Sequence, residues 1–159
     1  MRIGLGYDSH RLVAGRRFVL GGVEIACEEG LLGHSDADVL VHAVCDAILG
    51  AIGEGDIGRH FPDTDPAYRD ISSLKLLSQV WLLAKKKGYE VNNIDSTVVL
   101  ERPKLQGYIP EMAMNIAGTL GITPEVVNIK ATTNEGMGFI GRNEGVAAFT
   151  VVALREKEA

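Results

Sequence analysis

The residue types best suited to chemistry lie near the start of the chain, in Asp8-Ser9-His10 and at His42. The triplet closes a segment expected to be extended, in which residues i and i+2 point to the same face. Asp8 and His10 can therefore direct a carboxylate and an imidazole at one point. If His42 converges on that point, the three side chains supply two nitrogens and one oxygen, a donor set that Zn²⁺ accepts. Three protein ligands leave a further position of the ion open for a substrate.

The neighbouring sequence favours this metal site over the alternative, a turn carboxylate beside a surface imidazole. The chain contains four histidines. Three of them, His10, His34 and His42, fall in or beside the cluster, and the fourth is His60. The stretch His-Ser-Asp-Ala-Asp at 34–38 adds two carboxylates just before His42.

Each carboxylate around His42 has more than one role open to it. Asp36 or Asp38 is placed to cap the N-terminus of the helix that is expected to follow. Asp38 could instead orient His10, although we favour the cap. Asp46 lies one helical turn after His42, where it could hold the imidazole in place or simply be a solvated helix residue.

The composition indicates one globular domain. With 159 residues, 46% of them hydrophobic and 23% charged, the chain can bury a core of ordinary size. Its formal net charge of −5 argues against a nucleic-acid-binding surface, because neutralising phosphates needs a basic face. A phosphorylated ligand would have to be bound locally, by metal ions, backbone N–H groups and a few Lys or Arg side chains.

The two cysteines, Cys27 and Cys45, form no Cys-x-x-Cys motif and favour a reducing compartment, which we take to be the cytoplasm. The first residues turn polar by Asp8, so we expect no signal peptide. No apolar run approaches the roughly 20 residues that a membrane span needs, and no membrane partner is expected.

Hydrophobic periodicity and turn residues predict the elements that must position these side chains. Helices are expected at 38–50, 72–87 and 108–120. Strands are expected at 2–7, in a hairpin across 19–25 with a Gly-Gly turn, and at 92–100, 126–131 and 145–154. Loops are expected at 28–37 and 53–70. This order predicts a single α+β domain over 1–159, with a mixed sheet of four core strands and helices packed on one face, as in a ferredoxin-like sandwich.

Seven motifs occur in an order that points to a known family. They are Gly-Tyr-Asp-Ser-His (6–10), His-Ser-Asp-Ala-Asp (34–38), Gly-Asp-Ile-Gly (55–58), Phe-Pro-Asp-Thr-Asp (61–65), Arg-Pro-Lys (102–104), Lys-Ala-Thr-Thr-Asn-Glu (130–135) and Gly-Phe-Ile-Gly-Arg-Asn-Glu-Gly (138–145). The chain resembles the 2-C-methyl-D-erythritol 2,4-cyclodiphosphate synthases of the non-mevalonate isoprenoid pathway, and the resemblance covers essentially its whole length. The chain departs from the family pattern at Ala37, where Gly is frequent, and at Gly136, where Lys is also common.

The resemblance implies a lyase that cyclises 4-diphosphocytidyl-2-C-methyl-D-erythritol 2-phosphate. The 2-phosphate attacks the β-phosphorus of the diphosphate, and CMP leaves. The sequence has no P-loop and no Ser/His/Asp or Cys/His nucleophile pattern, and none is required, because the nucleophile belongs to the substrate. A phosphate monoester has a second pKa of about 6 and is mostly dianionic at neutral pH. Positioning and electrostatic stabilisation should then supply most of the rate.

The resemblance also implies roles for particular residues. The ligands of Zn²⁺, or of another divalent metal, would be Asp8, His10 and His42. Glu135 would bind a Mg²⁺ or Mn²⁺ ion that bridges the diphosphate. His34 and Thr133 would be catalytic, with His34 stabilising the transition state.

The implied substrate contacts fall into four groups. Those near the metal are Asp8, Ser9, His10, His34 and Ser35. Those for the erythritol part are Asp56, Ile57 and Gly58, with a nearby flap of Phe61, Pro62, Asp63, Thr64 and Asp65. Those for cytidine are Leu100, Glu101, Arg102, Pro103, Lys104, Leu105 and Gln106. Those for the diphosphate are Ala131, Thr132, Thr133, Asn134 and Glu135, with Phe139 and Arg142 beyond them. Asp63 and Asp65 are explained equally well as turn residues beside prolines, and Arg142 as a subunit-interface residue.

The resemblance further implies a homotrimer whose active sites lie between subunits. One subunit would supply the zinc ligands, and its neighbour the cytidine pocket and the Thr-Thr segment. An apolar isoprenoid ligand on the trimer axis is a further partner to consider. The strand at 145–154 is apolar on both faces and needs cover on both, which agrees weakly with such an assembly.

Two other functions use the same residues. A zinc-dependent phosphohydrolase would activate water with the same ligands and give a linear product. A trimeric scaffold would need zinc for folding and would unfold when the metal is removed. One further motif does not point to a function. Gly4-Leu5-Gly6 resembles the start of a dinucleotide fingerprint, but Ser9 stands where the third glycine is required.

Overall fold

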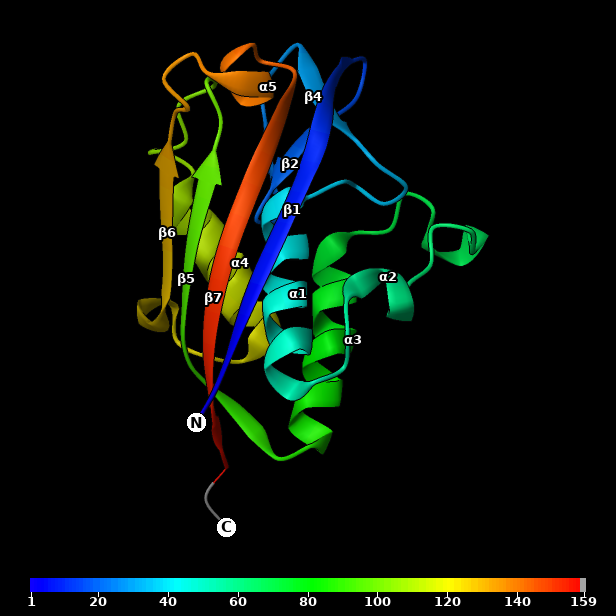
Figure 1. Cartoon of the computed structure of the whole chain (residues 1–159), viewed down its shortest axis with the longest axis vertical. Helices are drawn as coiled ribbons and strands as arrows, with labels where there is room; N and C mark the ends of the chain where they lie inside the picture. Colours follow the sequence, from blue (N-terminus) through cyan, green and yellow to red (C-terminus); the bar gives the residue numbers. More distant parts are fainter. Residues whose placement is uncertain (158–159) are drawn as a thin grey trace.

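The main sheet has five strands in the order β4-β1-β7-β5-β6 (Figure 1). It belongs to a computed structural model that describes residues 1–157. The strands are β1 Arg2–Ala14, β4 Glu29–Leu32, β5 Tyr89–Val99, β6 Val127–Thr132 and β7 Gly145–Glu156. β5 and β6 run parallel, whereas the other neighbouring strands are antiparallel. The sheet is therefore mixed, as expected, with the short β4 added at one edge of the four expected core strands.

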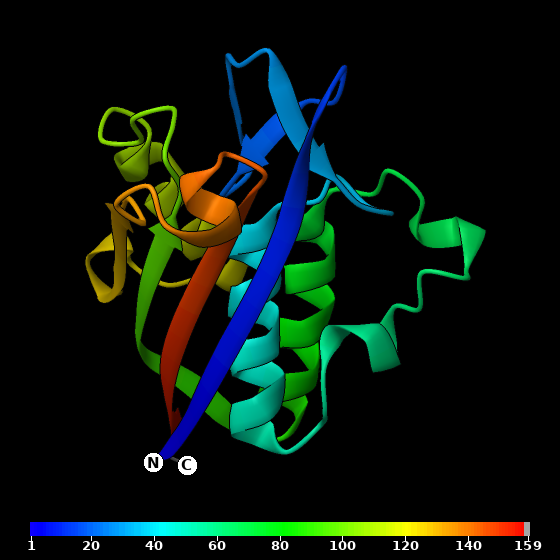
Figure 2. The ribbon, with the colours of Figure 1, turned by 45° about the horizontal axis from the view of Figure 1, so that its top comes forward.

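Three helices pack along one face of this sheet (Figures 1 and 2). They are α1 Val39–Ile52, α3 Ser73–Lys86 and α4 Ile109–Leu120. Short helical turns lie in the connections: α2 Ile57–His60, η1 Pro66–Tyr68, η2 Pro124–Val126 and α5 Gly138–Gly141. A separate hairpin, β2 Phe18–Leu20 and β3 Val23–Ile25, turns at Gly21-Gly22, where both glycines have positive φ. The mixed α+β class and the Gly-Gly hairpin are both confirmed.

Three segments differ from the sequence-based expectation. β1 runs to Ala14 and does not end at residue 7, so His10 lies within the strand. The stretch 28–37 contains β4, which pairs with the far end of β1. The stretch 53–70 contains α2 and η1. The physical reason is shared: polar residues interrupt the alternation in β1, and elements of three or four residues are too short to show a period.

Helix α1 approaches β1 closely because two residues of the strand have no side chain. A Cβ atom at Gly4 would lie 1.8 Å from the carbonyl oxygen of Ala47, and one at Gly6 would lie 1.8 Å from that of Ala43. Only glycine allows backbones to approach this closely. Asp8 and His10 continue the same face of the strand, because residues two apart point the same way. The packing therefore carries α1 across the strand positions from which both side chains project.

Along β1 and β7, the opposite face of the sheet is apolar and exposed in the single chain. Ile3, Leu5 and Tyr7 alternate with the glycines along β1, and Phe149 and Val151 lie beside them on β7. These five side chains are between 43% and 69% exposed. The rings of Tyr7 and Phe149 are 4.9 Å apart. An apolar sheet face of this kind needs a partner layer to be removed from water.

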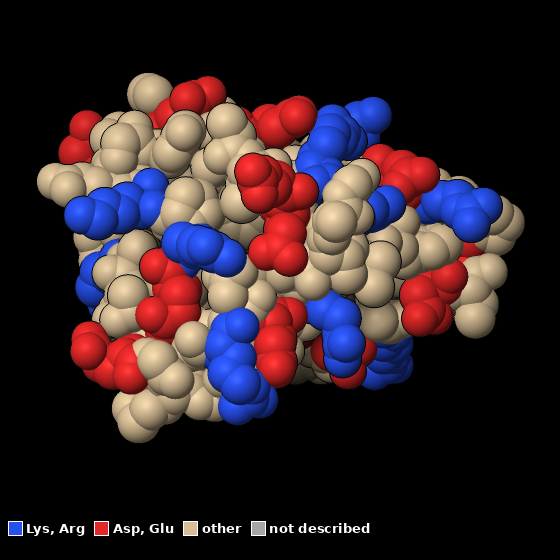
Figure 3. Space-filling view, turned by 90° about the horizontal axis from the view of Figure 1, so that it is seen from above, with Lys and Arg blue, Asp and Glu red and all other residues tan. Residues whose placement is uncertain are grey.

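The distribution of surface charge and the character of the helices can be compared with the expectations about nucleic acid and membrane partners. Lys and Arg side chains alternate with Asp and Glu side chains on the face seen from above, so neither sign dominates it (Figure 3). Among residues 1–157, no helix combines the length and the apolar character that crossing a bilayer demands.

We predict that Gly6→Ala destabilises the protein by at least about 3 kcal/mol, because the new methyl group meets helix backbone that cannot turn away. Urea unfolding measures the change. The matched control is Gly50→Ala in α1, where the nearest atom to the added Cβ is 3.9 Å away. That control should be neutral or more stable by up to about 1 kcal/mol. A Gly6→Ala protein as stable as the parent would contradict the packing argument.

Candidate active site

Asp8, His10 and His42 converge as the sequence predicts. Oδ2 of Asp8 lies 2.9 Å from Nε2 of His10 and 3.0 Å from Nδ1 of His42. The two imidazole nitrogens are 3.1 Å apart. Asp8 and His10 project from one face of β1, and His42 comes from the first turn of α1. Three donor atoms thus surround one point, and they form a group that could hold a metal ion.

The outer nitrogens of both rings are engaged by hydrogen bonds. Nδ1 of His10 lies 2.8 Å from the carbonyl oxygen of Leu32 on β4, to which it can only donate. Nε2 of His42 lies 2.8 Å from Oγ of Ser73 and 3.1 Å from Oγ of Ser35. In neutral rings held this way, the inner nitrogens carry lone pairs. Two nitrogen lone pairs and a carboxylate then face one point, which fits a cation shared between them.

The electrostatics of the cluster also favour positive charge beside Asp8. Burial opposes ionisation of Asp8, but the close contacts with the His10 and His42 imidazoles outweigh it and hold the pKa of this carboxyl well below its usual range. Burial likewise opposes protonation of His10, yet the contact with Asp8 prevails and raises the pKa of that imidazole. The carboxylate is therefore ready to act as a ligand at neutral pH, with no proton to be removed from it first.

Asp38 and Asp46 hold backbone segments and do not orient the histidines. Asp38 caps α1 through the amide of Val41, as favoured above, and also accepts N–H bonds from Gly21 at 3.0 Å and Gly22 at 2.7 Å. Burial raises the pKa of Asp38 to about 6, against the opposing effect of these hydrogen bonds. Asp46 accepts the amide of Ile57 at 2.7 Å. It thus anchors the start of α2, a role that the sequence did not suggest.

A pocket of about 500 Å³ opens directly over the three candidate ligands. Seven further expected substrate contacts line it: His34, Ser35, Ile57, Gly58, Phe61, Pro62 and Asp63. Sequence reasoning missed Leu32, Gly33, Tyr68 and Leu76, which also line it. Leu76 lies on the buried face of α3, where helical periodicity is the available signal. Nothing in the spacing of Tyr68 marks it.

Several expected contacts near this pocket have structural partners instead. Ser9 points to the other face of β1 from Asp8 and His10, because the side chains alternate. Asp56 caps α2 through the amide of Arg59. Asp65 caps η1 through the amide of Ala67, in agreement with its reading as a turn residue. Its carbonyl oxygen lies 3.0 Å from Nε2 of His34.

A second pocket, of about 470 Å³, lies where the parallel strands β5 and β6 end. Its lining includes nine expected contacts: Leu100, Glu101, Pro103, Lys104, Leu105, Gln106, Ala131, Thr132 and Thr133. Ile109, which sequence reasoning missed, completes the lining. Oε1 of Glu101 accepts the amides of Asn134 at 2.9 Å and Gly136 at 3.3 Å. The two expected segments thus form one site held by a carboxylate bridge.

The two pockets share no lining residue and lie in different parts of the chain. β7 separates β1, which carries two of the candidate metal ligands, from β5 in the sheet. His34 and Thr133 are therefore not brought together into one pocket by a single chain. Arg142 lies in neither lining; it pairs with Glu144 through hydrogen bonds of 2.9 and 3.1 Å. Phe139 likewise lies outside both and is partly exposed on α5.

The two departures from the family pattern both occur at positive φ. Ala37 has a φ of 57° and is fully buried, and Gly136 has a φ of 74°. Glycine adopts this conformation without strain, whereas an alanine pays roughly 1–2 kcal/mol. The frequent glycine at 37 thus has a backbone reason, and Ala37 retains the same conformation at some cost.

The fold and the site define a candidate metalloenzyme with two separate pockets. A model of the YgbB family matches residues 1–155, and the chain belongs to this family. It is 61% identical over 158 residues to the 2-C-methyl-D-erythritol 2,4-cyclodiphosphate synthase of Syntrophus aciditrophicus, with 99% of each chain covered. The enzyme of that name from Geotalea uraniireducens is 61% identical over 157 residues, with 99% of this chain and 100% of the relative covered. The resemblance stated from the motifs is confirmed.

Solved structures agree with the fold. A 2-C-methyl-D-erythritol 2,4-cyclodiphosphate synthase in a CDP-bound form superposes with a TM-score of 0.89 at 36% identity, covering 97% of this chain and 100% of the other. The CDP complex of IspF from Plasmodium falciparum gives a TM-score of 0.87 at 34% identity, covering 99% and 97%. Relatives of this fold thus bind a cytidine diphosphate.

We predict that His42→Ala weakens zinc binding by more than about 100-fold, because it removes one of three ligands. The parent protein should hold about one zinc ion per chain, as measured by metal analysis after dialysis and by competition with a chelator. His60→Ala is the matched control, since the His60 imidazole hydrogen-bonds the carbonyl oxygen of Glu54 and is not one of the three candidate ligands. Equal zinc binding by the two variants would rule out the site.

Proposed function

We propose that this chain converts 4-diphosphocytidyl-2-C-methyl-D-erythritol 2-phosphate into 2-C-methyl-D-erythritol 2,4-cyclodiphosphate and CMP. The observation that carries the proposal is the Asp8, His10 and His42 triad opening into a pocket that His34 and Ser35 also line. A phosphate seated there meets imidazole and hydroxyl groups beside the candidate metal ligands. The names of relatives about 60% identical over their full length support the same reaction.

The reaction needs no nucleophile from the protein. An oxygen of the 2-phosphate forms a bond to the β-phosphorus, and the bond from that phosphorus to the oxygen shared with the α-phosphate breaks. That oxygen leaves with CMP, so the electron pair ends on the CMP phosphate. Asp8, His10 and His42 would hold a Zn²⁺ ion that acts as a Lewis acid on a phosphate oxygen. His34 and Ser35 would orient the reacting phosphates, which is where the enzyme supplies rate.

We assign the second pocket to the nucleotide. Backbone groups of 100–106 would read the cytosine edge, and the Thr132 and Thr133 hydroxyls would contact the diphosphate. Glu135 has an exposed carboxylate that accepts the Thr133 hydroxyl at 3.1 Å. It would help to hold a Mg²⁺ or Mn²⁺ ion, which would offset negative charge on the diphosphate. CDP in the related structures supports a cytidine ligand for this fold.

We further propose a homotrimer in which each active site joins the metal pocket of one subunit to the nucleotide pocket of its neighbour. Two observations support it: the pockets are separate within one chain, and the sheet face with Leu5, Tyr7 and Phe149 is apolar and uncovered. An isoprenoid ligand would bind against that face at the trimer axis. The free thiols Cys27 and Cys45 suit the reducing cytoplasm, where we place the reaction.

We predict that ³¹P NMR of the purified protein with this substrate, zinc and magnesium shows a cyclic diphosphate appearing together with CMP. His42→Ala should lower the rate by at least about 100-fold, because an electrostatic stabiliser is lost. Inorganic phosphate or a linear diphosphate would favour the phosphohydrolase. Unchanged substrate in a folded, zinc-loaded sample would favour the trimeric scaffold. A scaffold that needs zinc for folding must also unfold when a chelator removes the metal.

We also predict that co-expressed His34→Ala and Thr133→Ala subunits recover activity that neither variant has alone. In a shared-site trimer with random mixing, about a quarter of the sites pair an intact metal half with an intact nucleotide half. Steady-state rates of the isolated mixed trimers measure the recovery. Sites contained within one chain would give no recovery, since every chain then carries a damaged site.

A further inference from the structure

Behind His42, on the side away from the candidate metal, two residues form a hydrogen-bonded relay. We infer that Asp36 and Ser73 are positioning residues that fix the orientation and the tautomer of the His42 ring. The inference rests on the metal site of the proposed function and gives roles to two residues for which the family resemblance implies none. Neither Asp36 nor Ser73 itself lines the pocket that the substrate would occupy.

The relay starts at the first residue of α3. Ser73 is fully buried, and its Oγ lies 2.8 Å from Nε2 of His42. The same hydroxyl donates a short hydrogen bond to Oδ1 of Asp36. The backbone amide of Ser73 donates to the other oxygen, Oδ2, at 3.0 Å. Asp36 thus holds Ser73 by two bonds, and Ser73 in turn contacts the ring.

The direction of these bonds decides which ring nitrogen carries the proton. A carboxylate only accepts hydrogen bonds, and a serine hydroxyl has one proton to donate. That proton is committed to Asp36, so toward His42 the Ser73 oxygen can only accept. Nε2 of His42 must therefore carry the hydrogen, which leaves a lone pair on Nδ1. Nδ1 is the atom that lies 3.0 Å from Asp8 and 3.1 Å from His10.

Ser35 does not set this direction by itself. Its Oγ also lies 3.1 Å from Nε2 of His42 and accepts the amide of Ala37 at 3.2 Å. No carboxylate is bonded to this hydroxyl, so its proton is not committed in the way that of Ser73 is. With Nε2 already a donor, the Ser35 hydroxyl can donate to Oγ of Ser73, 3.5 Å away, or into the pocket that it lines. The relay thus leaves Ser35 able to donate to a phosphate.

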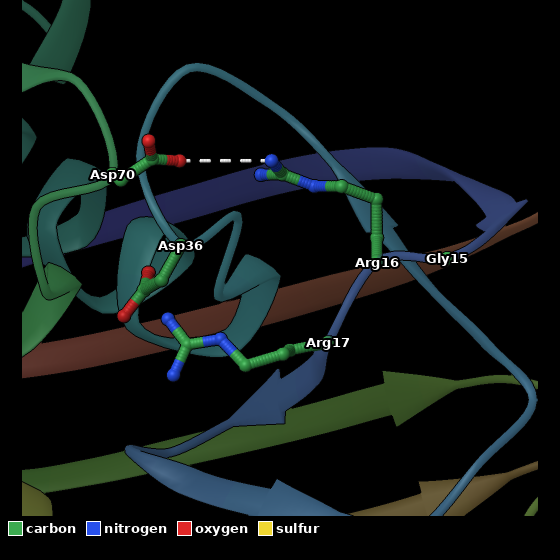
Figure 4. Close-up of a pocket in the computed structure, with 5 residues that line it drawn as sticks. All are labelled: Gly15, Arg16, Arg17, Asp36 and Asp70. Carbon is green, nitrogen blue, oxygen red and sulfur yellow. Dashed lines mark ion pairs between the residues drawn. The ribbon is translucent and has the colours of Figure 1, made fainter.

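The backbone around Asp36 is clamped, which makes it a fixed support. Its amide donates to the carbonyl oxygen of Ile71 at 3.0 Å, and the amide of Asp70 donates to that of His34 at 2.8 Å. Asp36, Asp70, Arg16 and Arg17 line a small cavity of about 170 Å³. Figure 4 shows the two carboxylates facing the two guanidinium groups, with Arg16 paired to Asp70. These contacts therefore hold segments 33–36 and 70–73 together, independently of their contacts with the His42 ring.

Arg16 adds a second tie to the same loop. Its guanidinium donates to the carbonyl oxygens of Gly33 and Ser35, both at 3.2 Å, and pairs with Asp70 at 3.6 Å. These contacts hold the backbone on both sides of His34 without touching the histidines of the metal site. The position of Asp36 is thus set by the fold and does not depend on a bound metal.

The first test is zinc affinity of the full-length protein, measured by competition with a chelator. Ser73→Ala should bind zinc about 10–100-fold more weakly, the usual cost of removing a partner behind a ligand. Ser72→Ala is the matched control, because Ser72 precedes α3 and its side chain makes no capping hydrogen bond. Asp36→Asn should weaken binding in the same direction. In the Ser73→Ala background it should add nothing, since Asp36 acts on the ring through Ser73.

The second test reads the tautomer directly. In ¹⁵N NMR of the metal-free protein, His42 of the parent and of Ser72→Ala should be protonated at Nε2. Ser73→Ala should shift it towards a mixture with the Nδ1–H form, which a purely structural role would not do. If Ser73→Ala fails to fold, Asp36→Asn supplies both readouts.

The possible results distinguish failure of the relay from failure of the metal site. A parent protein that binds zinc, with Ser73→Ala folded and within about twofold of its affinity, overturns the relay and leaves the proposed function standing. A parent protein that binds no zinc overturns the metal centre itself. A His42 ring that carries no hydrogen on Nε2 in the parent also overturns the relay, whatever the affinities.

Discussion

The close packing of α1 on β1 is the constraint on which the site depends. Gly4 and Gly6 let the helix backbone come within a distance that any side chain would prevent. Because the residues that follow on the same face are Asp8 and His10, the helix that crosses the glycines delivers His42 to them. The ligand geometry is therefore a consequence of backbone contact two and four residues earlier in the strand. A longer separation between helix and strand would leave three polar side chains without a common point.

The same strand serves two purposes, because its side chains alternate. The face towards α1 carries glycines and then ligands, whereas the other face carries Ile3, Leu5 and Tyr7. Burying the second face needs another layer, and a single chain does not provide one. The proposed trimer would cover that face and at the same time bring a second pocket to the ligands. Assembly and catalysis would then be coupled through one strand, which explains why neither pocket contains the full set of expected residues.

The sequence alone predicts those parts of the site that follow from local periodicity. The shared direction of Asp8 and His10, the helix bearing His42 and the cap at Asp38 all depend on neighbours within a few residues. The role of Gly4 and Gly6 was missed, because the requirement for no side chain is set by a helix far along the chain. Ser73 was missed for the same reason: its contacts with His42 and Asp36 span 31 and 37 residues. The short β4 and α2 lacked enough residues to display a period.

Several charged side chains near the pockets form hydrogen bonds with backbone groups, which gives them a structural role. Asp38 holds the hairpin to α1, Glu101 holds the loop at 134–136, and Arg16 holds the loop at 33–35. A reaction whose nucleophile belongs to the substrate asks the protein mainly for fixed positions, since two phosphates must approach each other against their own repulsion. Side chains that immobilise the loops meet that need, because a rigid donor loses no free energy to reorganisation as charge develops.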